Sequence, residues 1–240
     1  MSEERRGAGP DGIVLIDKPS GITSHDAVAI VRRALGTRKV GHAGTLDPMA
    51  TGLLVMGVGR ATRLLRFLGD LTKLYEGTMR LGVETETLDA DGVVMHTASV
   101  DVTNDAIDAA MAAKLGASAQ RPPAFSAVKV GGRTLHEAAR KGEVLEAPAR
   151  IVRVDRFERT GRDGDDVTFV AAVSGGTYVR VLAADVGAAL GCGAHLTALR
   201  RTAIERRYFP ASFVTPSSSR SRETLACVTG NPFLRRAFTN

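Results

Sequence analysis

The most informative stretch of this chain is Gly41-His-Ala-Gly-Thr-Leu-Asp-Pro-Met-Ala-Thr-Gly-Leu-Leu54. Its glycines allow positive φ angles and a close approach of the backbone to a partner. Asp47 precedes Pro48, which pushes the aspartate towards an extended conformation. The pattern therefore indicates a carboxylate held on a stiff loop, where it could act in catalysis. Asp-Pro also commonly begins a turn, so on these residues alone a purely structural turn is the more frequent interpretation.

A phosphate-binding loop is a further interpretation of this glycine-rich region. The region has no Walker lysine–serine pair, and the following Gly57-Val-Gly-Arg-Ala-Thr62 lacks the third glycine of a dinucleotide fingerprint. The glycines therefore do not indicate a nucleotide cofactor.

The elements on either side of this stretch mix strand and helix patterns. Thr23 and Asp26 form a capping-box pair ahead of a helix that ends at Gly36. Arg162-Asp-Gly-Asp165 is typical of a hairpin turn. Periodicity predicts strands at 12–18, 75–83, 150–159 and 166–174, and helices at 24–35, 103–115, 134–141 and 181–190. Because they do not follow a strict βαβ order, we predict an α+β fold with a mixed, largely antiparallel sheet.

The bulk composition excludes several classes of protein. The 240 residues are 44% hydrophobic, and no apolar run approaches the roughly 20 residues that span a bilayer. Residues 1–11 are polar, so we expect a flexible N-terminus on a cytoplasmic protein. The two cysteines form no C-x-x-C pair, and the five histidines show no metal-ligand spacing, so no metal is expected.

The positive charge is concentrated near the end of the chain. Residues 205–240 hold six arginines and two glutamates, a net charge of +4. Since the whole chain carries +6, only +2 remains for residues 1–204. Bulk charge is therefore weak support for a nucleic-acid partner, and any basic surface on the body must be local.

Several motifs, in order, resemble one known family, the bacterial tRNA pseudouridine-55 synthases of the TruB type. The resemblance covers residues 12–202, and it includes the stretch 41–54. The other matching motifs are Asp17-Lys-Pro-Ser-Gly-Ile-Thr-Ser24, Lys73-Leu-Tyr75, Gly82-Val-Glu-Thr-Glu-Thr-Leu-Asp89, Arg121-Pro-Pro-Ala-Phe-Ser-Ala-Val-Lys-Val-Gly-Gly132, Gly176-Thr-Tyr-Val-Arg180 and His195-Leu-Thr-Ala-Leu-Arg-Arg201.

The resemblance implies a reaction and the residues that perform it. Asp47 matches the aspartate that attacks the uridine nucleotide, at either the ribose C1′ or the base C6. Tyr75 matches the tyrosine that stacks on the base, and Tyr178 a second aromatic. Arg180 matches the arginine that pairs with the aspartate, where a nearby cation keeps a carboxylate ionised, and Leu199 an apolar pocket residue. No cofactor is expected, because the carboxylate performs the covalent step.

The same resemblance implies tRNA, through its T-stem-loop, as the partner of a monomer. The target base must be flipped out of the folded loop, and His42 matches the histidine that enters the vacated position. Lys18, Lys129 and Arg133 are then candidates for phosphate contacts or loop support. Residues 123–150 are expected to form a mobile insert that closes over the RNA.

The end of the chain departs from the family. After Thr202, the run Ala203-Ile-Glu-Arg-Arg-Tyr-Phe209 replaces the usual Val-Gly pair and sheet. We therefore expect a catalytic domain at 12–204, followed by an atypical basic tail at 205–240 without a complete PUA domain. This departure motivates an alternative function, that of a noncatalytic RNA-binding protein or tRNA folding chaperone. Action on a different uridine is also open.

Overall fold

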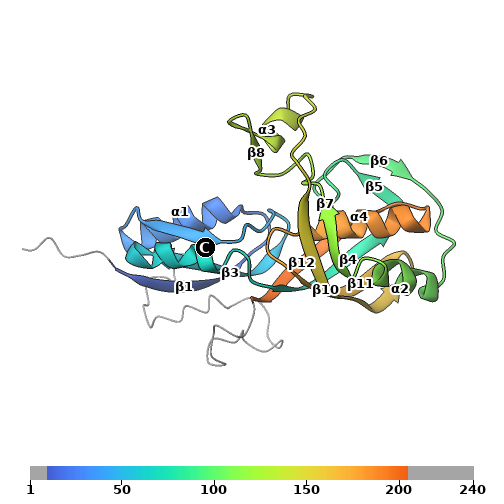
Figure 1. Cartoon of the computed structure of the whole chain (residues 1–240), viewed down its shortest axis with the longest axis horizontal. Coiled ribbons are helices and arrows are strands. Elements are labelled where there is room, and N and C mark those ends of the chain that lie inside the picture. Colours follow the sequence, from blue (N-terminus) through green and yellow to red (C-terminus); the bar gives the residue numbers. More distant parts are fainter. Residues whose placement is uncertain (1–9, 205–240) are drawn as a thin grey trace, which may run out of the picture. The chain divides into compact units, whose positions relative to one another are not determined.

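The computed structural model describes residues 10–204, which form two compact units (Figure 1). The first unit comprises the described residues up to Leu71 and those from Arg200, and the second comprises Thr72–Leu199. The expected flexible N-terminus lies largely outside the described residues, and the basic tail at 205–240 lies wholly outside them.

The first unit is a small sheet with one α-helix. Strand β1 (Gly12–Lys18) and strand β2 (Val40–Ala43) both pair antiparallel with β3 (Thr51–Val58). The end of β12 (Ala194–Ile204) pairs parallel with β3, with Arg201 opposite Gly52. The remaining elements are α1 (Ser24–Leu35) and the 3₁₀ helix η1 (Gly59–Phe67). Apolar side chains from the strands and from the end of η1 form a common core of Leu15, Ala43, Val55, Leu68 and Ile204.

The second unit is built on five hydrogen-bonded strands of a β-sheet. Their order is β12, β4 (Lys73–Leu81), β11 (Asp166–Val173), β10 (Arg150–Asp163) and β7 (Gly116–Gln120). Helix α2 (Asn104–Ala112) packs against both α4 (Val179–Leu190) and β10 (Figure 1). Two small hairpins complete it, β5 (Val83–Thr85) with β6 (Val94–Thr97), and β8 (Lys129–Val130) with β9 (Arg133–Thr134), which leads into α3 (Leu135–Ala139).

Local sequence signals explain several of these elements. The Thr23 hydroxyl accepts from the Asp26 amide, and the Asp26 carboxylate accepts from the Thr23 amide, so the predicted capping box starts α1. Gly36 ends α1 with a φ of 60°. Along β4 the buried side chains alternate as predicted, and Gly77 leaves room for the ring of Phe169, which an added Cβ would approach to 2.5 Å. The α+β class and the largely antiparallel sheet are confirmed.

Two details of the sequence prediction were wrong or incomplete. The helix predicted to reach Leu115 ends at Ala112, and Leu115 is 48% exposed instead of lying on the buried face. A turn closes the helix there, ahead of Gly116 at a φ of 92°. Most strands were not predicted from the sequence, namely β2, β3, β5, β6, β7, β8, β9 and β12. In β3 the glycines and a continuous buried run hide the alternation by which a half-exposed strand is recognised.

Candidate active site

Asp47 lies on a tight turn of the first unit, between β2 and β3. The Asp47 carbonyl accepts a hydrogen bond from the Ala50 amide at 3.1 Å, which closes a β-turn with Pro48 in its first central position. The Asp47 residue is half-buried. The structural turn and the positioned carboxylate, which the sequence offered as alternatives, are therefore compatible with each other.

Ser24 holds the residue that precedes Asp47. Its hydroxyl accepts from the Leu46 amide at 2.9 Å and donates to the Leu46 carbonyl at 3.1 Å. Ser24 is only 1% exposed, and Leu46 is also buried. One side chain at the first residue of α1 thus pairs with both polar backbone groups of Leu46, which limits the movement of Asp47.

Lys18 and Gly21 hold the residue that follows Asp47. The Pro48 carbonyl accepts from the Gly21 amide at 2.9 Å and from Lys18 Nζ at 3.2 Å. The Lys18 ammonium also donates to the carbonyls of Pro19 and Ile22, at 2.9 and 2.7 Å. Lys18 is fully buried. This geometry fits the loop-support role that was one of the two expected for Lys18.

Arg201 holds both ends of the segment around Asp47. Its guanidinium donates to the Gly44 carbonyl at 2.9 Å and to the Leu53 carbonyl at 2.7 Å, and the residue is 1% exposed. Gly52 approaches the Arg201 backbone so closely, at a φ of 99°, that an added Cβ would lie 2.3 Å from the Arg201 carbonyl oxygen. Only glycine fits there.

His42 lies in β2, shortly before the Asp47 turn. Its ring meets that of His25 edge to face, with 5.5 Å between centroids. Burial, together with the positive charges of His25 and Arg201, lowers the pKa of His42 to about 4. Its buried Nδ1 has no hydrogen-bond partner among residues 10–204. The ring is therefore neutral near pH 7, and one of its polar atoms is unused within this part of the chain.

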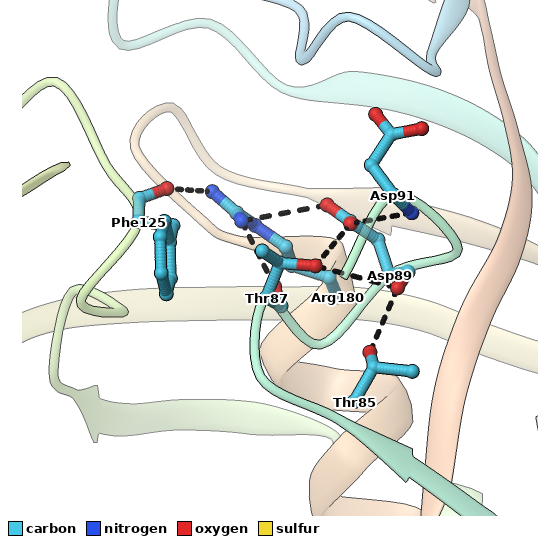
Figure 2. A network of polar contacts seen from close by, with 6 residues as sticks. All are labelled: Thr85, Thr87, Asp89, Asp91, Phe125 and Arg180. Atoms are coloured by element: carbon cyan, nitrogen blue, oxygen red, sulfur yellow. Dashed lines mark hydrogen bonds and ion pairs between the residues drawn. The ribbon is translucent and has the colours of Figure 1, made fainter. Parts of the chain in front are cut away.

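In the second unit, Arg180 lies at the centre of a buried polar network (Figure 2). Nη1 donates to the Thr87 carbonyl at 3.0 Å and lies 3.4 Å from the Asp89 carboxylate, and Nη2 donates to the Phe125 carbonyl at 2.6 Å. Asp89 also accepts from the Thr87 hydroxyl at 2.5 Å and from the Asp91 amide at 3.2 Å. Arg180 is 3% exposed and lies in the first turn of α4. Two residues spaced like Tyr178 and Arg180 would share one face of a strand and would more often lie on a solvated edge, but here Arg180 is in a helix and buried.

The structure brings two of the predicted site residues of this unit into contact. The Arg180 guanidinium lies 5.8 Å from the centre of the Tyr178 ring. Buried Gln120 holds Tyr178 by accepting from its amide at 2.8 Å and donating to its carbonyl at 3.2 Å. Tyr75 is buried in β4 and Leu199 is buried in β12. The predicted pairing of Arg180 with Asp47 joins the two units and stays a prediction.

Two candidate RNA-binding residues lie on the hairpin of the predicted insert. Lys129 in β8 pairs with Thr134 of β9, and Arg133 is the residue before Thr134. Both basic side chains are exposed. Arg133 forms an ion pair with Glu143 at 2.6 Å. The hairpin and α3 thus form a small folded piece within residues 123–150, and its closure over RNA stays a prediction.

Three residues that hold the site were not identified from the sequence: Ser24, Gln120 and Arg201. Ser24 and Arg201 lay inside recognised motifs, which was the available signal. Within residues 10–204, no group of three or more His, Cys, Asp or Glu side chains could hold a metal ion. No helix in that part of the chain is long and apolar enough to cross a membrane.

Comparison with known proteins gives consistent similarities. The family model for the N-terminal domain of TruB family pseudouridylate synthases matches residues 32–179, and that for the tRNA pseudouridylate synthase B C-terminal domain matches residues 180–215. The tRNA pseudouridine synthase B of Mycobacterium sp. (strain KMS) is 53% identical over 200 residues, covering 81% of this chain and 67% of that protein. That of Thermobifida fusca is 52% identical over 203 residues, covering 81% and 69%.

Solved structures show the same fold. A chain in the crystal structure of a Cbf5-Nop10-Gar1 complex matches with a TM-score of 0.62 and 35% identity, over 80% of this chain and 48% of that one. A chain in an H/ACA RNP bound to a substrate RNA containing 2′-deoxyuridine matches with a TM-score of 0.60 and 32% identity, over 80% and 47%. This chain therefore spans about two thirds of its curated relatives and about half of these structural neighbours.

Proposed function

Because the chain belongs to the TruB family of pseudouridylate synthases, we propose that it converts uridine 55 in the T-loop of tRNA to pseudouridine. The observation that carries this proposal is the 53% identity to a tRNA pseudouridine synthase B over 200 residues, which include the Asp47 turn. In this isomerisation the N1–C1′ bond breaks, a C5–C1′ bond forms, and the C5 proton is replaced by one on N1.

Asp47 is the proposed nucleophile. The turn is held at Leu46 by Ser24, at Pro48 by Lys18 and Gly21, and at Gly44 by Arg201. A nucleophile that is already positioned loses little entropy when it reacts, which lowers the barrier. Arg180 supplies the positive charge that keeps the carboxylate ionised in the reacting complex, as its place in the family motif implies.

The flipped base requires an apolar and aromatic environment. Tyr75 and Tyr178 are the proposed aromatic partners and Leu199 the apolar one. Base flipping costs a few kcal/mol, and stacking on one aromatic ring returns about 1–3 kcal/mol. His42 takes the vacated position in the T-loop. Its low pKa supports this role, because a neutral imidazole enters a stack of bases without carrying a buried charge.

Lys129 and Arg133 are the proposed phosphate contacts of the insert at 123–150. Both are exposed on one short hairpin. Because tRNA is the proposed substrate, we also propose a cytoplasmic location. We propose separately that the protein acts as a monomer.

The test is release of tritium from a T-stem-loop RNA labelled at C5 of uridine. Wild-type protein is expected to release it, and Asp47→Asn is expected to abolish release while RNA binding remains. The matched control is Asp70→Asn, which removes an exposed carboxylate of the same unit. Full activity of Asp47→Asn would exclude Asp47 as the nucleophile. RNA binding by a wild-type protein that forms no pseudouridine would favour the noncatalytic alternative, and stem-loops with other uridines test the position of modification.

A further inference from the structure

One residue that lies between two hydrogen-bond partners of Arg180, Thr87 and Asp89, has an unusual backbone. Leu88 has a φ of 66°, and it is the single non-glycine residue with a positive φ in the part of the chain that the structure describes. This left-handed conformation brings Cβ close to the following carbonyl oxygen and is unfavourable for leucine. Such conformations persist only where the surrounding structure enforces them, and they concentrate at functional sites.

Hydrogen bonds on both sides hold Leu88 in this conformation. Its amide donates to the Thr85 carbonyl at 3.1 Å, and its carbonyl accepts from the Leu196 amide at 3.0 Å. The next residue, Asp89, forms an isolated bridge with Leu196, and its carbonyl accepts from the Thr85 hydroxyl at 2.7 Å. The loop is therefore attached to β12 and to itself on either side of the strained residue.

The left-handed backbone of Leu88 affects the partners of Arg180 (Figure 2). The Thr87 carbonyl and the Asp89 carboxylate, which flank Leu88, both converge on Nη1 of Arg180, at 3.0 and 3.4 Å. In an extended chain, a carbonyl points in the plane of the sheet, towards the neighbouring strand. The side chain two residues later points out of that plane, to one face of the sheet. In a helix, that carbonyl would accept from the amide four residues later. Neither regular conformation presents these two acceptors to one nitrogen.

We propose that Leu88 is a positioning residue of the pseudouridine synthase reaction, whose left-handed backbone fixes the direction of the Arg180 guanidinium. This inference rests on the proposed function for its link to catalysis. Glycine would adopt the same φ without strain, but it would also sample other conformations and hold the loop less firmly. The half-buried leucine side chain is not required, so asparagine, which tolerates this conformation, can replace it.

The experiment compares Leu88→Asn, Leu88→Val and a control, Leu115→Val. Valine is branched at Cβ and disfavours a positive φ, and Leu115 is a half-exposed leucine of the same unit, outside the network. Single-turnover pseudouridine formation and RNA affinity are measured for each. We expect Leu88→Val to slow the reaction by about tenfold or more, as misplacement of a catalytic group does, with RNA affinity within about twofold. Leu88→Asn and Leu115→Val should stay within about threefold of wild type in rate.

A second measurement does not depend on activity. In free protein labelled with ¹⁵N-arginine, solvent exchange of the Arg180 guanidinium protons is followed by NMR, with Arg180→Lys to assign the signals. Faster exchange in Leu88→Val, but not in Leu88→Asn, supports the inference. Equal exchange in all variants overturns it, as does a Leu88→Asn variant as slow in turnover as Leu88→Val. A wild-type protein that forms no pseudouridine counts against the proposed function, while the exchange data still decide whether Leu88 positions Arg180.

Discussion

Replacing Ser24 with alanine tests whether the Asp47 turn is held from α1. The substitution removes the hydroxyl that pairs with both the amide and the carbonyl of Leu46. Because Leu46 is buried, each group that loses its partner costs about 1–3 kcal/mol. Alanine favours the helix over serine by about 0.5 kcal/mol, which offsets a small part of the loss. We therefore expect the free energy of unfolding to fall by about 1.5–5.5 kcal/mol. At about 2–4 °C per kcal/mol, the melting temperature should fall by about 3–22 °C.

The same substitution should affect the reaction more than RNA binding. Leu46 is adjacent to Asp47, and a misplacement of about 1 Å can cost roughly 100-fold in rate. We expect the single-turnover rate to fall about 10- to 100-fold, with little change in the affinity for a T-stem-loop. Urea denaturation followed by circular dichroism gives the stability, and tritium release gives the rate.

Ser20→Ala is the matched control, because it makes the same chemical change at an exposed position of the preceding loop. Its stability and rate should equal those of wild type. The reasoning would be refuted if Ser24→Ala lost less than about 0.5 kcal/mol, or if its rate equalled that of Ser20→Ala.

Three further substitutions follow from the structure. Arg180→Met removes the positive charge and should lower the free energy of unfolding by about 3–5 kcal/mol, because the buried Asp89 carboxylate loses its ion-pair partner. A loss below about 1 kcal/mol in urea denaturation would contradict this. Gly52→Ala should lower the free energy of unfolding by more than about 3 kcal/mol, because the added Cβ clashes with the Arg201 backbone and the φ is positive. Gly131→Ala, also at a positive φ but in open space, should lower it by about 1 kcal/mol. Equal losses of stability in the two variants would refute the clash. For His42, the folded pKa of about 4 lies below the unfolded value of about 6.5, so the unfolded state binds more protons between these values and stability falls as pH drops from 6.5 towards 4. His42→Asn should remove that pH dependence, about 1 kcal/mol after solvent screening of a half-buried ring, and an unchanged stability profile between pH 4 and 7 would disprove it.

Elements with local signals were predicted well. β1 and α1 have the predicted bounds, and the capping box joins residues only three positions apart. The β10–β11 hairpin and α4 also follow from patterns within a few residues. The end of α2 was wrong, because Leu115 continued the helical spacing although the chain had already turned. The strand β12 was missed, since its residues become a strand by pairing with β3 and β4, far earlier in the chain.

By itself, the sequence determined which residues are candidates for catalysis and that Asp47 begins a turn, because motif identity and an Asp-Pro turn depend on neighbouring residues. Tertiary structure alone decided what holds that turn. Arg201 reaches Gly44 and Leu53 across about 150 positions, and Ser24 reaches Leu46 from another element. The left-handed backbone of Leu88 is likewise enforced by Leu196, more than 100 residues later. A periodic pattern carries no information about such contacts, because they form only when distant segments have folded against one another.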